Sequence, residues 1–207
     1  MRLVVPVRDA SGGERGSSPV ELLIASTVGM LAVAAAVSLL RTHAALALDV
    51  QTALGATGGA SWALRVVLPD VRLAGGDPQR RNLPAVAAGG RESVVLLRDR
   101  DGDGRADPDS EETVRLAWSA SSNGRLVRQV GAQPMAVAGT VPRGGLRLRY
   151  FDELGDEIDA AAPLDAATRE RIRRIAVELD VVERLGAVSS AVRLTSAASL
   201  RLREGPR

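Results

Sequence analysis

Residues 16–40 read GSSPVELLIASTVGMLAVAAAVSLL. The part after Glu21, residues 22–40, contains no charged side chain. As an α-helix it would be roughly 28 Å long, close to the hydrocarbon thickness of a bilayer. Gly29 and the alanine-rich segment 32–36 are small enough for other helices to approach closely in lipid. The sequence therefore predicts a transmembrane helix over residues 17–40.

Glu21 is a charged residue at the edge of this apolar run, and no basic residue lies near it on the following helix face. A carboxylate at membrane depth costs on the order of 3 kcal/mol, so it needs a partner. A cut after Gly16 would create an α-amino group on Ser17, close to Glu21 along the chain. That amine could pair with Glu21 in the same molecule or in a packed neighbour.

This arrangement resembles the class III signal of type IV prepilins and pseudopilins. In that family a polar, basic leader ends in Gly, the cut follows, and Glu stands fifth after the cut. Ser18, Pro19 and Glu21 match the family pattern, whereas Ser17 stands where Phe or Met is usual. The resemblance implies that prepilin peptidase cuts between Gly16 and Ser17 and that Ser17 is then N-methylated. It also implies that Glu21 makes the assembly contact with a neighbouring subunit.

Two other interpretations of the apolar run remain open. The first is an uncleaved signal anchor with a chance glutamate, and the second is a secretory signal peptide that is removed after the run. The continuation Arg41-Thr42-His43 is a poor cut site for a signal peptidase. In the prepilin hypothesis residues 1–16 are the leader peptide, whose Arg8 and Arg15 help to hold that end in the cytoplasm.

The next segment, residues 41–75, is predicted to continue the helix outside the membrane as an amphipathic element. Gly55, Gly58 and Gly59 leave open a kink, a local unwinding or an end of the helix, and Gly75-Gly76 supplies a natural stop. The residues expected to form its apolar set are Leu46, Leu48, Val50, Leu54, Trp62, Val66, Leu68, Val71 and Leu73. The stretch ALRVVLPDVRLAGG at residues 63–76 resembles the end of the first helix in W-type minor pilins and J-type minor pseudopilins.

Residues 76–207 are predicted to form a β-rich domain, with 77–90 as a surface connection. Asn123-Gly124 is a hairpin turn signal. Alternating or short apolar runs predict strands over residues 93–97, 114–118, 126–130, 146–150, 175–181 and 192–202, with a further segment near 158 and a short helical turn over 165–172. The expected fold class is α+β, a long N-terminal helix followed by an antiparallel β-sheet, as in pilins.

The amino-acid composition excludes several classes of functional site. The chain has no cysteine and no lysine, and its formal charge is only +2. These absences exclude disulfides, and they exclude P-loop or Schiff-base chemistry that needs an amine. The single His43 does not make a zinc site. A basic run over residues 169–174 is not interleaved with aromatic side chains, which argues against nucleic-acid binding. No constellation of residues supports an enzyme.

An acidic loop at residues 99–107, DRDGDGRAD, is the one candidate metal site. Its aspartates stand at the first, third, fifth and ninth places and Gly104 at the sixth, the spacing of a calcium loop. The twelfth place holds Ser110 where an EF-hand has Glu, and two glutamates follow it. The alternative is a solvated Asp-Gly turn. The predicted structural Ca²⁺ ligands are Asp99, Asp101, Asp103, the carbonyl of Arg105, Asp107, Glu111 and Glu112.

The resemblance implies a minor pilin or a type II secretion minor pseudopilin that helps to initiate or cap a filament. Its implied partners are prepilin peptidase, other major and minor pilins or pseudopilins, and the inner-membrane assembly platform. The implied location is a single pass through the inner membrane with a periplasmic C-terminal domain, and then the pilus or pseudopilus. The alternative function is a membrane-anchored calcium-binding or adhesive module that never enters a filament.

Overall fold

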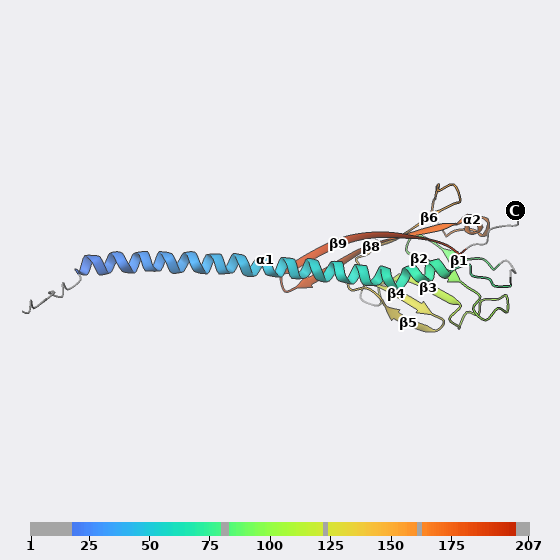
Figure 1. The fold of residues 1–207 in the computed structure, drawn as a ribbon, viewed down its shortest axis with the longest axis horizontal. Helices are drawn as coiled ribbons and strands as arrows, with labels where there is room; N and C mark the ends of the chain where they lie inside the picture. Colours follow the sequence, from blue (N-terminus) through green and yellow to red (C-terminus); the bar gives the residue numbers. More distant parts are fainter. Residues whose placement is uncertain (1–17, 80–82, 122–123, 161–162, 202–207) are drawn as a thin grey trace, which may run out of the picture. The chain divides into compact units, whose positions relative to one another are not determined.

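The computed structural model describes residues 18–79, 83–121, 124–160 and 163–201. In them the chain forms a long helix α1 (Pro19–Leu73), a short helix α2 (Ala166–Arg171) and antiparallel strands (Figure 1). The strands are β1 (Val86–Gly89), β2 (Ser93–Leu97), β3 (Thr113–Ser119), β4 (Arg125–Val130), β5 (Gln133–Ala136), β6 (Leu146–Phe151), β7 (Glu157–Ile158), β8 (Arg174–Leu185) and β9 (Val188–Ser199). The expected α+β layout, a long apolar N-terminal helix followed by antiparallel strands, is confirmed.

The chain divides into two compact units, Met1–Leu46 and Ala47–Arg207, and each is described by itself. In the first unit every side chain of α1 is exposed. Pro19 takes the first helical position, where its missing N–H is not needed. By length and composition α1 is apolar enough to cross a membrane, as an anchor or a signal sequence does.

In the second unit α1 buries one stripe of mostly small side chains. The buried residues are Thr52, Ala56, Ala60, Ala63, Leu64, Val67, Leu68, Asp70 and Val71. Steps of three and four along a helix place side chains on one face. The prediction of the buried apolar set in residues 41–75 is partly wrong, since Leu54 is 68% exposed and Trp62 is 48% exposed. Leu68 and Val71 of the predicted set are buried on this face, whereas Leu54 and Trp62 lie off it. Beside the stripe, α1 passes close to β8.

The glycines of α1 show how close that packing is. A Cβ added at Gly55 would lie 3.2 Å from Cγ of Glu183, and one added at Gly59 would lie 3.9 Å from Cγ1 of Val181. These glycines do not interrupt the helix, which also continues through Pro69. The predicted stop is confirmed, because Gly75 takes the left-handed conformation with φ of 79° just after the last turn.

The strands form two antiparallel sheets where one was expected. Sheet A has the order β1-β2-β3-β4-β5, and sheet B has the order β7-β6-β8-β9. The predicted strands correspond to β2, β3, β4, β6, β8 and β9, and α2 lies within the predicted helical turn. Of the hairpin signal Asn123-Gly124, only Gly124 is described; its φ is 66°, and it lies between β3 and β4.

Two strands contradict the sequence-based predictions. β1 lies inside residues 77–90, which were predicted to be only a surface connection, and β5 was not predicted at all. β1 is mostly alanine and glycine, and β5 contains Pro134, so neither shows the alternation of large apolar residues that marks a strand. Pairing with neighbouring strands forms both of them despite this composition.

Two buried polar contacts join the elements of the second unit. Tyr150 on β6 is fully buried and donates its hydroxyl to the carbonyl oxygen of Gly90 at 2.8 Å, which links sheet B to the β1–β2 turn. Burial raises the pKa of Tyr150, so the phenol stays protonated. Asp70 of α1 accepts two hydrogen bonds from Arg128 of β4, from Nε at 2.5 Å and Nη2 at 2.9 Å. This bidentate ion pair fixes α1 against sheet A.

Candidate functional site

The start of α1 carries the predicted assembly site, and only part of it is described. Gly16 and Ser17, the predicted cleavage and methylation residues, lie outside the described residues. Glu21 lies exposed in the first turn of α1. The basic side chains in residues 18–46 are Arg41 and His43. Arg41 is roughly 30 Å farther along the helix, so α1 supplies no nearby cation for Glu21.

The acidic loop between β2 and β3 brings three predicted calcium ligands together. Carboxylate oxygens of Asp99, Asp101 and Asp103 lie within 4.8 Å of one another. Asp99 is only 5% exposed and accepts hydrogen bonds from the N–H groups of Gly102 at 2.6 Å and Gly104 at 2.9 Å. Both glycines have positive φ, 83° and 80°. The sharp turn that the spacing required is therefore present, and it points alternate oxygens at a common volume.

Glu112 has a different environment from the one predicted. It is 5% exposed, and its Oε1 accepts hydrogen bonds from the N–H groups of Arg100 at 2.7 Å and Asp101 at 3.2 Å. Its Oε2 accepts from the N–H of Asp107 at 3.1 Å. These bonds, that of Arg100 first, lower the pKa of Glu112 and keep it ionised. Glu112, just before β3, thus holds the start of the loop at Arg100 and Asp101 near its end at Asp107 through hydrogen bonds to backbone amides.

The carboxylates of Asp107 and Glu111, two further predicted ligands, are not in the aspartate cluster among the described residues. Glu111 forms an ion pair with Arg100, and both side chains are mostly exposed. The carbonyl of Asp107 accepts hydrogen bonds from the hydroxyls of Ser110 and Thr113, each at 3.0 Å. Arg105 donates its N–H to Oδ1 of Asp103 at 2.8 Å. The structure therefore supports a smaller candidate cation site, made of Asp99, Asp101 and Asp103.

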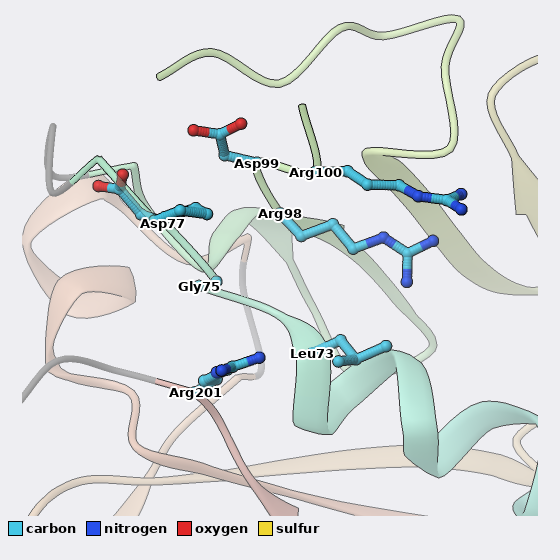
Figure 2. Close-up of a pocket in the computed structure, with 9 residues that line it drawn as sticks. Leu73, Gly75, Asp77, Arg98, Asp99, Arg100 and Arg201 are labelled. Carbon is cyan, nitrogen blue, oxygen red and sulfur yellow. The ribbon is translucent and has the colours of Figure 1, made fainter. Parts of the chain in front are cut away.

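Beside this loop lies a cavity of about 770 Å³ at the end of α1. Figure 2 shows the carboxylates of Asp77 and Asp99 on one side of it, whereas the side chains of Arg98 and Arg100 extend away from Asp99. The loop and the helix end are joined by two backbone bonds, Gly75 N–H to the Leu97 carbonyl at 2.8 Å and Asp99 N–H to the Gly76 carbonyl at 2.7 Å. These bonds bring Asp77 beside Asp99.

Sequence reasoning missed Asp77 as a neighbour of the acidic loop. Its Oδ2 accepts from the N–H of Leu83 at 3.3 Å. Its Oδ1 is buried and has no hydrogen-bond partner among the described residues. Asp77 follows the helix stop by two positions and stands 22 residues before Asp99, so no local spacing rule could connect them. A search of family models, curated proteins and solved structures finds no match to this chain.

Proposed function

We propose that this chain is a minor pilin or pseudopilin subunit that enters a filament through the first part of α1. The proposal rests on one observation. Helix α1 has an N-terminal part whose apolar side chains are all exposed, and a carboxylate, Glu21, lies in its first turn without a cation nearby. An exposed apolar helix requires lipid or other helices around it, and a carboxylate in that setting requires a positive partner.

The motif around residue 16 supplies that partner. A cut after Gly16 leaves the α-amino group of Ser17 near Glu21 of the same chain or of a neighbour. In a single subunit within the membrane the carboxylate has at most the amine of its own chain, whereas in the assembly a neighbour's amine also comes within reach. Glu21 would then select the axial position at which a subunit enters the filament.

The first experiment is intact-mass and N-terminal analysis of the protein from its native membrane. A chain that begins at N-methylated Ser17 is the expected result. A chain that retains residues 1–16 while prepilin peptidase is present would contradict the proposal. Glu21→Ala is expected to leave membrane insertion and cleavage intact and to prevent incorporation into filaments. The matched control is Glu153→Ala, which removes an exposed carboxylate from the turn before β7.

A second candidate is a membrane-anchored calcium-binding or adhesive module that never enters a filament, and the aspartate cluster is the observation that favours it. Three carboxylates converge there, and a bound cation would relieve the repulsion among them. Titration of the full chain in detergent with calcium tests this candidate, and bound ion should raise the melting temperature. Asp101→Asn should remove the rise, while Asp109→Asn outside the cluster should not. An unchanged melting temperature at millimolar calcium would exclude the ion.

A further inference from the structure

The acidic loop between β2 and β3 contains two Asp-Gly sequences, Asp101-Gly102 and Asp103-Gly104. Glycine has no side chain to hinder its backbone nitrogen, so aspartate before glycine is the aspartate sequence that isomerises most readily. Both aspartates are exposed. Their carboxylates also belong to the aspartate cluster described above. A change at either residue would therefore alter the candidate cation site.

In this isomerisation the backbone nitrogen of the glycine attacks Cγ of the preceding aspartic acid. The nitrogen loses its proton and Cγ loses its hydroxyl group, so one water molecule leaves and a five-membered succinimide ring forms. Water then adds to one of the two ring carbonyls. Addition at Cγ restores aspartate, whereas addition at the main-chain carbonyl leaves the backbone running through the side chain as isoaspartate. The reaction needs only water, and neither an oxidant nor a reductant takes part.

Asp99 holds the backbone nitrogens that would attack in both sequences. Its Oδ1 accepts the N–H of Gly102 at 2.6 Å, and its Oδ2 accepts the N–H of Gly104 at 2.9 Å. Asp99 is buried, so water competes little for these charge-assisted hydrogen bonds. Attack on Cγ requires the peptide plane to rotate and the N–H to leave its acceptor. One buried carboxylate therefore restrains both reactions.

The side chains of the two aspartates are held as well. Oδ1 of Asp101 accepts the N–H of Asp103 at 2.9 Å, and Oδ1 of Asp103 accepts the N–H of Arg105 at 2.8 Å. Each bond keeps the carboxylate on the amide two residues ahead, so the side chain must turn before Cγ can meet the nitrogen of the next residue. The two sites differ in burial, since Gly102 is buried and Gly104 is half-buried. Asp101 is therefore the better protected residue.

We propose that Asp101 and Asp103 are sites of isoaspartate formation and that Asp99 keeps both unreactive in the folded chain. Asp99 acts through the glycine amides and is a positioning residue. Isoaspartate adds one carbon to the backbone and leaves the free carboxylate on a shorter side chain. A modified loop would no longer gather its three carboxylates in one place. This inference depends on hydrogen bonds within the described loop and not on the proposed function.

The test uses the full chain in detergent micelles at neutral pH, with a chelator present so that no cation shields the loop. Samples are incubated folded or in denaturant and then digested with trypsin, which releases residues 101–105 as one peptide. Mass spectrometry with electron-based fragmentation distinguishes isoaspartate from aspartate at each position. In denaturant both residues should isomerise at similar rates. In the folded chain both should react at least about tenfold more slowly, and Asp103 should react faster than Asp101.

Two variants separate restraint of the glycine amides from general loosening of the loop. Asp99→Ala frees the N–H groups of Gly102 and Gly104. Glu112→Ala removes the acceptor of three other backbone N–H groups of the same loop and leaves both glycine amides on Asp99. The rate of isoaspartate formation should rise by at least about tenfold in Asp99→Ala and by less in Glu112→Ala. Amide hydrogen exchange of the two glycines should follow the same order.

Melting temperatures establish whether both variants fold. Should Asp99→Ala fail to fold, Asp99→Asn takes its place. Its side-chain amide keeps one acceptor oxygen, so one of the two glycine N–H groups should stay restrained and the other should be freed. Isoaspartate should then accumulate faster at one of the two aspartates than in the wild type, and not at the other.

Several outcomes would overturn the proposal. A denatured chain that forms no isoaspartate at these residues would show that they are not modification sites. A folded wild type that isomerises as fast as the denatured chain would show that the loop gives no protection. Equal acceleration in Asp99→Ala and Glu112→Ala would reduce Asp99 to a structural role. Slower isomerisation in Asp99→Ala would mean that Asp99 removes the amide proton as a base, which is the opposite of protection.

Discussion

The two parts of helix α1 share backbone geometry and differ in what stabilises them. From Pro19 to Leu46 every side chain is exposed, and residues 22–40 carry no charge. From Ala47 to Leu73 the same helix buries one stripe in the core of the second unit and keeps its other face exposed. No side chain of the first part is buried, whereas the sheets of the second unit bury one stripe of the second part.

The difference teaches that apolar content and burial are separate properties of a helix. The most apolar residues of α1, such as Leu31 and Met30, are exposed, while the fully buried Ala60 and Ala63 are among its smallest. Large side chains suit a helix surrounded by fluid lipid tails. Small ones allow a close approach where a helix packs against other elements of its own chain. The two tryptophans, Trp62 and Trp118, both lie in the second unit, so their fluorescence reports on that unit alone.

Among the polar contacts the largest effect is expected from Asp70→Ala, which leaves the half-buried guanidinium of Arg128 without its partner. Asp70 is 4% exposed, and its carboxylate raises the pKa of Arg128. The free energy of unfolding should fall by about 3 kcal/mol, measured by tryptophan fluorescence in denaturant. Asp180→Ala, which breaks the more exposed pair with Arg193, should cost about 0–1 kcal/mol. Equal losses in both variants would show that burial of the ion pair is not what matters.

Two substitutions compare the buried face of α1 with its exposed face. Ala60→Leu inserts a large side chain into the buried stripe, where Ala60 has no exposed surface, and should cost about 1–3 kcal/mol of unfolding free energy. A Cβ at Gly58 on the outer face meets no atom within 4 Å. Gly58→Ala should therefore stabilise the chain by about 0.5–1 kcal/mol through helix propensity. Stabilisation by Ala60→Leu would mean that the stripe is not tightly packed.

Acid should unfold the second unit and leave the first part of α1 helical. Backbone hydrogen bonds lower the pKa of Glu112, and Arg193 lowers that of Asp180. A lowered pKa contributes stability that is full above the unfolded-state value and is lost as the pH falls through the folded-state value. The melting temperature should therefore begin to fall when the pH is lowered below about 4.5, and it should fall further as the pH decreases.

The matched variant Glu112→Gln tests the source of this acid sensitivity. The substitution removes the charge and places an amide N–H₂ donor opposite the N–H donor of Asp107. The free energy of unfolding should therefore fall by about 1–3 kcal/mol at neutral pH. The substitution should also flatten the acid dependence. Circular dichroism in lipid vesicles would show the helical signal of residues 19–46 surviving at low pH. An acid profile unchanged by Glu112→Gln would assign the sensitivity to other carboxylates.

The smallest effect is expected in the first part of α1. Leu31→Ala removes a large apolar side chain that is 70% exposed, so the unfolding free energy reported by the tryptophans should change by less than about 0.5 kcal/mol. The same leucine-to-alanine change at the fully buried Leu126 should cost about 2–5 kcal/mol. A large loss from Leu31→Ala would show that residues 19–46 stabilise the second unit.

The sequence predicts the features that local rules control. The apolar run, the stop at Gly75 and the alternation in β6 and β8 all follow from periods of 3.6 and 2 residues or from turn chemistry. The spacing of the acidic loop likewise predicts the convergence of Asp99, Asp101 and Asp103. The calcium ion, the cleavage at Gly16 and the role of Glu21 stay predictions.

What the sequence does not predict depends on distant partners. The close approach of Gly55 and Gly59 to β8 and the pairing of Asp70 with Arg128, 58 positions apart, both join distant parts of the chain. Glu112 was expected to bind a metal, and no spacing rule reveals that its oxygens accept three backbone N–H groups. β1 and β5 form through cross-strand pairing that their compositions do not favour.

The packing of β8 against α1 also fixes the order in which this chain can fold during synthesis. Gly59 precedes Val181 by 122 positions. At about 5–20 residues per second, the part of α1 around Gly59 waits roughly 6–24 s before its neighbour on β8 exists. Through that interval this part of α1 is open to chaperones and proteases. A chain that stops before Arg174 never covers it, so nonsense mutations late in the gene should yield protein that is degraded, although its apolar run is intact.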